Sequence, residues 1–145
     1  MNQFSVHESV KSASAMNPQS LAATGGYVAQ LTIDRLGYES AKLVCKSGAA
    51  INAPATQSLK FKLQEGDAAN GSDAADIASA KLGVGQTSWE VELTTDNEIG
   101  YLGFQTTQLK RYITLTVSAA FTGGAAPENI LDAVLEMGVS YQEPV

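Results

Sequence analysis

The chain has 145 residues, a length that suits one domain and leaves little room for a second. Its formal net charge is −6 and its few basic residues are not clustered, which disfavours a nucleic-acid partner because an acidic surface repels a polyanion. The sequence contains no apolar run long enough to cross a bilayer and no basic-then-apolar leader after Met1, so we expect neither a membrane nor a secreted protein.

Residues 1–25 are rich in Ser, Ala, Asn and Gln and carry only scattered apolar side chains. Because this segment has no sustained periodicity, we interpret it as an extended N-terminal arm, followed by a domain at residues 26–145. Two accounts of the arm stay open: a frayed terminus, or a segment ordered by lying across a partner. In the second account the candidate partner contacts are Phe4, Val6, Val10 and Leu21.

Alternation of apolar and polar residues predicts the first strands of the domain. Residues 27–33 alternate, and residues 42–46 form a short strand in which Cys45, the only cysteine, is expected to be a small buried side chain. Residues 59–64 alternate most regularly, with Lys60 and Lys62 facing solvent or guarding a sheet edge.

Residues 65–85 gather small polar side chains and four acids, Glu65, Asp67, Asp73 and Asp76. Counting back from Gly71 does not place oxygen ligands at the positions that a calcium loop needs, so we interpret the segment as a solvated loop. Asp73 and Asp76 are also suited to cap a short helix over residues 77–82.

The clearest strand signals lie in residues 88–121. In residues 88–94 the alternating apolar positions begin at Trp89, and in residues 112–121 they begin at Ile113. The intervening even-numbered residues of the second segment, Thr114 and Thr116 among them, are assigned to the solvent-facing side. Gly100 and Gly103 flank aromatic and apolar residues, which indicates a bend or a close backbone approach. Residues 130–141 fit a strand better than a helix. Together these segments predict an all-β fold, an antiparallel β-sandwich or jelly roll of about seven or eight strands.

The sequence offers no catalytic constellation that we can assemble, and we assign no catalytic, cofactor-binding or metal-binding residue and no cofactor. His7, the only histidine, lies in the polar arm, and nucleophilic catalysis normally needs a positioned base. Glu90 and Glu92 share a strand face as two glycosidase acids would, although they also fit a solvated face. Trp89 and the tyrosines fit a sugar-stacking platform, but core packing explains Trp89 more simply.

Three stretches carry a family resemblance: residues 36–44 (LGYESAKLV), residues 59–67 (LKFKLQEGD), and residues 100–103 (GYLG) followed by residues 110–115 (KRYITL). In their order and spacing the chain resembles small structural proteins encoded beside the capsid genes of tailed bacteriophages and prophages. The resemblance implies a virion component with a β-sandwich core, made in the cytoplasm of a bacterial host.

Within that family, the resemblance implies a capsid decoration or cement protein on the outer head surface. Such a protein binds the major capsid protein lattice and bridges its subunits, and we expect it to do so as a homotrimer. Removing residues 1–24 is then expected to weaken attachment and leave the domain folded. The alternatives are a neck or tail structural protein, such as a ring-forming adaptor or a tube subunit, and a carbohydrate-binding module.

Overall fold

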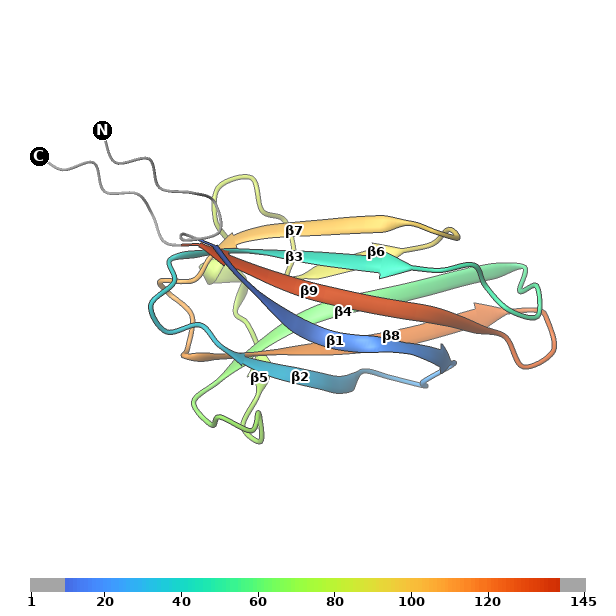
Figure 1. Cartoon of the computed structure of the whole chain (residues 1–145), viewed down its shortest axis with the longest axis horizontal. Helices are drawn as coiled ribbons and strands as arrows, with labels where there is room; N and C mark the ends of the chain where they lie inside the picture. The colour runs from blue at the N-terminus through green and yellow to red at the C-terminus, as the bar shows by residue number, and fades with distance from the viewer. Residues whose placement is uncertain (1–9, 139–145) are drawn as a thin grey trace, which may run out of the picture.

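The computed structural model describes residues 10–138 of the chain, and these residues form a two-layered antiparallel β-sandwich (Figure 1). The predicted fold class is therefore confirmed. The strands are β1 (Val10–Ala22), β2 (Val28–Asp34), β3 (Ser40–Ser47), β4 (Thr56–Gly66), β5 (Ala75–Asp76), β6 (Glu90–Leu93), β7 (Ile99–Gln105), β8 (Tyr112–Thr122) and β9 (Glu128–Gly138).

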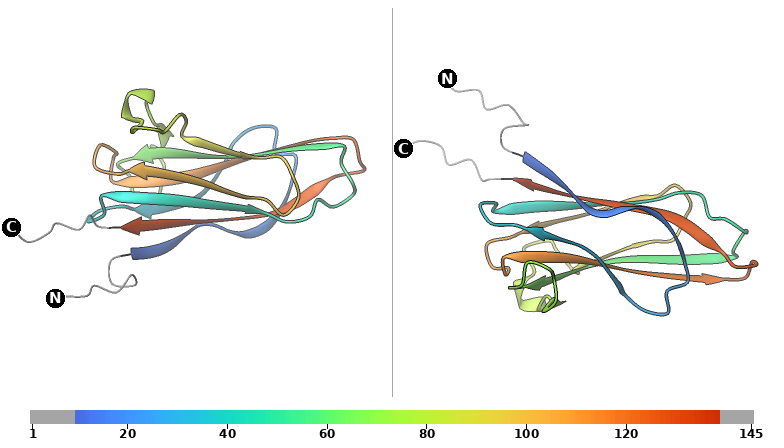
Figure 2. Two further views of the ribbon diagram at one scale, coloured as in Figure 1. Left: turned by 90° about the horizontal axis from the view of Figure 1, so that it is seen from above. Right: turned by 60° about the horizontal axis from the view of Figure 1, so that its bottom comes forward.

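The strand order is that of a jelly roll. Sheet A has the order β1-β9-β3-β7, and sheet B has the order β2-β8-β4-β5 with β6 also paired to β4. The chain thus pairs β1 with β9, β2 with β8, β3 with β7, and β4 with β5 and β6, which is a long antiparallel hairpin rolled into two layers. Figure 2 shows the two layers lying face to face.

The core fills the space between the layers because each long strand turns every second side chain inward. The central strand β4 contributes Leu59, Phe61 and Leu63, each at most 1% exposed. Sheet A contributes inward-facing residues of β3 and β9 to the same core, namely Leu43, Cys45, Leu131, Ala133, Leu135 and Met137. The predictions of a buried Cys45 in a strand and of a strand in the first part of residues 130–141 are confirmed; residues 139–141 lie outside the described part.

Strand β1 corrects the predicted domain boundary. Residues 10–22 are extended, as expected, but they pair with β9 along sheet A, and Ala15 and Met16 are buried in the core. The alternation was hidden because the strand has register shifts on both sides of Met16 and carries Pro18. Residues 10–22 therefore belong to the sandwich, and only residues 1–9 of the predicted arm lie outside the described residues.

Sheet B corrects three local expectations. Strand β4 pairs on both sides, so of the two roles expected for Lys60 and Lys62 the edge-guarding one is wrong, and both side chains lie partly exposed on the outer face of the sheet. The expected helix over residues 77–82 is a single 3₁₀ turn at Ser79–Lys81 without a side-chain cap. Asp73 instead accepts hydrogen bonds from the backbone N–H groups of Asp67 and Ala68, at 2.8 and 3.0 Å, and closes its own loop.

The predicted wet side of β8 is also partly wrong. Thr114 and Thr116 are 2% and 4% exposed. The loop at residues 67–74 lies over the outer face of sheet B, where a side chain at Gly71 would collide with the hydroxyl groups of Thr32 and Thr114. Thr116 donates its hydroxyl to the Lys62 carbonyl at 3.0 Å. A loop distant in sequence thus lies over Thr114, a residue that alternation alone assigns to solvent.

Candidate interaction surface

The outer face of sheet A exposes several large apolar side chains. Across the sheet, Ser14 faces Val134, Val134 faces Val44, and Val44 faces Tyr101. Val44 and Val134 are half-buried, whereas Tyr101 is 57% exposed. Ile99 and Ile130 extend this surface, and each is 49% exposed. We call these five apolar residues the sheet A patch: Val44, Ile99, Tyr101, Ile130 and Val134.

Charges on the same face nearly cancel, with Glu128 of β9 as one extra anion. Lys42 lies directly opposite Glu136, and Lys46 lies directly opposite Asp132, so two cations face two anions across neighbouring strands. The Lys42 ammonium also lies 4.3 Å from the centroid of the Tyr101 ring, a cation–π contact. In a chain whose net charge is −6, these two pairs carry no net charge, and this face repels an acidic partner less than the rest of the surface does.

The outer face of sheet B has the opposite character, because a closed polar network covers it. The Lys62 ammonium lies 2.9 Å from an Asp76 carboxylate oxygen and 4.0 Å from the centroid of the Tyr27 ring. Tyr27 donates its hydroxyl to Glu90, which in turn lies 4.0 Å from Lys60. Burial of the hydroxyl, followed by its hydrogen bond to Glu90, raises the pKa of Tyr27 to about 12.

Contacts on the same face also hold Glu90 and Glu92, the two carboxylates that the sequence offered as candidate glycosidase acids. Glu90 is held by Tyr27 and Lys60, and Glu92 accepts a hydrogen bond from the Ser58 hydroxyl at 2.6 Å. Both lie on the outer face of sheet B, as the alternation predicted. Trp89 is 7% exposed and packs edge-on against Phe104, with ring centroids 5.5 Å apart, so it is a core residue and offers no face to a sugar.

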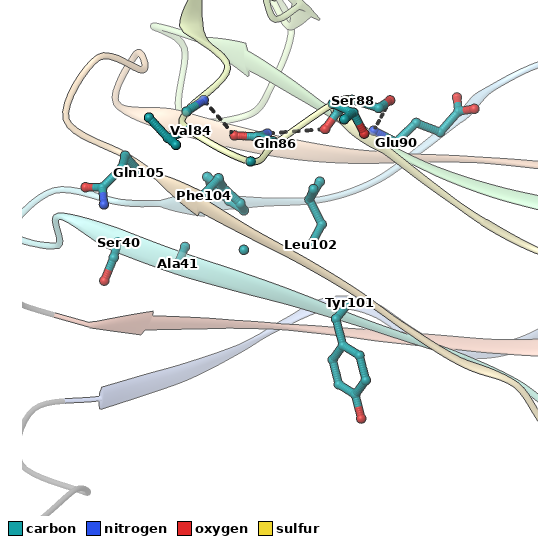
Figure 3. Close-up of a pocket in the computed structure, with 14 residues that line it drawn as sticks. Ser40, Ala41, Val84, Gln86, Ser88, Glu90, Tyr101, Leu102, Phe104 and Gln105 are labelled. Atoms are coloured by element: carbon teal, nitrogen blue, oxygen red, sulfur yellow. Dashed lines mark hydrogen bonds between the residues drawn. The ribbon is translucent and has the colours of Figure 1, made fainter.

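A groove of about 950 Å³ runs beside β7 (Figure 3). Residues 83–88 form one wall and the segment from Tyr101 to Gln105 forms the other, with Ser40 and Ala41 at the end. Leu102 and Phe104 point toward the 83–88 loop, whereas Tyr101 points away from it (Figure 3). The groove lies along a strand that pairs with β3 on one side only.

The predicted partner contacts fall into three groups. Phe4 and Val6, like His7, lie outside the described residues. Val10 is 38% exposed and faces Gly138, so it lies at the end of sheet A where Ser40 and Gln105 also lie. Leu21 is half-buried and packs against the core, which leaves little of its side chain for a partner.

Comparisons of the chain with protein-family models, with curated proteins and with solved structures found no match. Residues 10–138 contain no cluster of three His, Cys, Asp or Glu side chains arranged to hold a metal ion. The same residues form no helix that is long and apolar enough to cross a bilayer.

Sequence reasoning missed the sheet A patch for a physical reason. It assigned one face of each strand to the core and the other to water, and this rule ignores apolar residues of opposite parity. Val134 in β9 and Tyr101 in β7 have that parity, since Leu135, one position after Val134, and Phe104, three positions after Tyr101, are buried. Only the pairing of β3, β7 and β9 brings these residues onto one surface.

Proposed function

We propose that this protein is a structural component of a tailed-bacteriophage virion that performs no catalysis. In this proposal it is a decoration protein that binds the outer surface of the major capsid lattice through the outer face of sheet A. The observation that carries the proposal is the contrast between the two sheet faces: the sheet A patch is apolar and lies among nearly balanced charges, whereas a polar network of ion pairs and hydrogen bonds lies on sheet B.

Two further points support this assignment. The three sequence stretches that resemble phage structural proteins fall on the frame of the sandwich, in β3, β4, β7 and β8. The jelly roll is also a fold that viral capsid proteins use, although a fold by itself assigns no function, and this point is an analogy. A sandwich whose outer sheet face carries an apolar patch among opposed charges suits attachment to a repeated surface better than it suits the enclosure of a small substrate.

Binding would stabilise the capsid by mass action. A protein that binds only the closed lattice raises the free energy needed to open that lattice, by an amount that grows with its free concentration relative to its dissociation constant. Apolar contact at the sheet A patch would supply the binding energy, and the opposed charge pairs around it would favour one orientation. Hence the face, and not any single residue, is the expected functional unit.

The proposal is tested with empty capsids made from the parent phage without this gene, to which purified protein is added before sedimentation. Ile130→Glu places a charge in the sheet A patch, and we expect it to lower binding at least about tenfold, because an unpaired charge would be buried in the contact. Ala120→Glu, on the exposed outer side of β8 in sheet B, is the matched control and should bind as the wild type does. Equal binding by the two variants, or none by the wild type, would contradict the proposal.

The structure also changes the expected truncation experiment. Deleting residues 1–24 would remove β1 and expose its partner β9, so loss of binding would then report loss of folding. Deleting residues 2–9 removes Phe4 and Val6 and keeps every described strand. If that shorter deletion leaves capsid binding unchanged, the N-terminal segment has no anchoring role.

A further inference from the structure

Strand β7 is the one sheet edge within residues 10–138 that lacks a device against pairing. At the other edge of sheet A, β1 carries Pro18 and two register shifts. In sheet B, β2 has a register shift between Ala29 and Thr32, and β5 and β6 have only two and four residues. Bulges, proline and short length are common ways to stop edge strands from pairing. Strand β7 has seven residues and none of these features, and it has no charged residue.

The backbone of β7 presents alternate residues to the open side. The Ser47 N–H donates to the Glu98 carbonyl and the Thr106 N–H donates to the Glu39 carbonyl, both at 2.9 Å, which fixes the even-numbered residues of β7 as those bonded to β3. The odd-numbered residues therefore direct their N–H and C=O groups away from the sheet. These are Ile99, Tyr101, Gly103 and Gln105.

We propose that this edge binds the same edge of a second copy of the chain. The two β7 strands pair antiparallel about a two-fold axis through Leu102, which joins the two A sheets into one continuous sheet of eight strands. In this register Tyr101 faces Gly103 of the second copy, and Ile99 faces Gln105 of the second copy. The four facing pairs exchange two hydrogen bonds each, and every outward backbone group of β7 finds a partner.

Side chains favour this occupant over other strands. A Cβ atom on Gly103 would have no neighbour within 4 Å, so the surface above this glycine is open. The proposed register places the Tyr101 ring of the second copy over that space, and a cross-strand aromatic residue commonly compensates for a strand glycine. The two-fold axis makes this contact twice. The strand is thus complementary to itself.

Charge also favours self-pairing. Each copy carries a net charge of −6, which opposes association in general. The residues of β7 are uncharged, and the nearest opposed pairs, Lys42 with Glu136 and Lys46 with Asp132, lie on β3 and β9 and sum to zero. An isologous contact of this kind closes after two copies, so the inference replaces the trimer expected from the sequence with a dimer.

This inference does not depend on the virion assignment, and sedimentation equilibrium of the purified full chain tests it. We expect a reversible monomer–dimer equilibrium. Gly103→Pro removes an outward N–H that β3 does not use, so it should shift the dissociation constant upward at least about tenfold, whereas Gly103→Ala keeps the donor and should retain the dimer. Thermal melting of the proline variant at low concentration checks that it is folded.

A disulfide test reads the register directly and does not need the proline variant. In the proposed dimer Leu102 faces Leu102 of the second copy as a non-hydrogen-bonded pair, whose Cα atoms lie about 4.5 Å apart, within disulfide range. Leu102→Cys should therefore form a covalent dimer on mild oxidation. Gln105→Cys is the matched control, because Gln105 faces Ile99 of the second copy and the two cysteines would lie six residues apart along the strands, roughly 20 Å, so it should remain reduced.

Several results would overturn the inference. A monomer at every concentration would do so, as would a trimer, or a dimer that survives Gly103→Pro with no Leu102→Cys cross-link. Dissociation of the dimer on deletion of residues 2–9 would assign the edge to the N-terminal segment of another copy and would equally overturn pairing between β7 strands. A dimer unchanged by that deletion supports the inference.

Discussion

Asn129 donates its side-chain amide to the Gln57 side-chain oxygen at 2.8 Å, and this buried hydrogen bond joins the two sheets. Asn129 belongs to β9 in sheet A, and Gln57 belongs to β4 in sheet B; they are 0% and 8% exposed. The Gln57 amide also donates to Asp96 at 3.1 Å, and the Asn129 oxygen accepts from the Gly48 N–H at 3.0 Å. One polar network therefore fixes the end of the sandwich opposite to Val10 and Gly138.

The first prediction concerns that network. Asn129→Ala leaves the Gln57 oxygen buried without its donor, so we expect a loss of about 1–3 kcal/mol in the free energy of unfolding, measured by urea denaturation. The pair Gln57→Met with Asn129→Leu removes donor and acceptor together, and its cost should be smaller than the sum of the two single costs. Additive costs would show that the two side chains are not coupled.

Gly100 sets how closely β7 approaches β6. A Cβ atom at Gly100 would lie 2.5 Å from Cγ1 of Val91 and 2.8 Å from Cδ2 of Leu93, so Gly100→Ala forces the sheets apart. We expect a cost of about 1–3 kcal/mol in the free energy of unfolding. Gly103→Ala, on the same strand with open space around it, should be neutral or stabilise by about 0.5 kcal/mol. Equal effects of the two alanines would contradict this account.

Because the pKa of Tyr27 is raised, we expect the free energy of unfolding to fall in strong alkali. Its pKa is raised to about 12 from 10.0 by burial and by Glu90, so between these pH values the unfolded chain loses the proton and the folded chain keeps it. The folded state then binds more protons, and the free energy of unfolding decreases as pH rises from about 10 to about 12. Below that range the contribution is complete.

Tyr27→Phe should flatten that part of the stability profile, measured by denaturation at a series of alkaline pH values. Tyrosinate absorption of the folded wild type should show a late-titrating component that the variant lacks. Tyr101→Phe keeps the contact between Tyr27 and Glu90 and serves as the control. A slope that Tyr27→Phe leaves unchanged would mean that another group carries the alkaline transition.

The complete burial of Cys45 leads us to expect an unreactive thiol. Its side chain is 0% exposed in the core, and burial raises the pKa of the thiol. Because the thiolate is the reactive form, a disulfide reagent should modify the native protein at least about a thousandfold more slowly than it modifies the unfolded chain. Since the chain has no other cysteine, the absorbance of the released reagent reports this site alone. Rapid native modification would contradict the burial of β3.

The fold was largely predictable because most of the long strands bury one clear apolar face. Phe61 and Leu63 in β4, like Leu115 and Val117 in β8, are fully buried at the positions that alternation assigns to the core. Strand β1 was not predictable in this way, because Pro18 and two register shifts interrupt its period. A strand of this composition is recognised as part of a sheet only through its pairing with β9.

The candidate interaction surface was less predictable, since it is a property of pairing. Tyr101, Val44 and Val134 are far apart in the chain and become neighbours only through the registers of β3 with β7 and of β3 with β9. The close approach at Gly100 was anticipated from its two-glycine context, but the open edge of β7 was not. Which strand lies at the edge of a sheet depends on the strand order, and the periodicity of a single strand does not indicate that order.

We propose that the outer face of sheet A attaches the protein to a phage head, and cryo-electron microscopy of intact particles from the parent phage tests this proposal most directly. We predict density for the sandwich on the outside of the capsid shell, in on the order of hundreds of copies following the lattice symmetry, with Val44, Val134 and Ile130 turned toward the shell. Density confined to the neck or tail, no density at all, or sheet B turned toward the shell would contradict the claim.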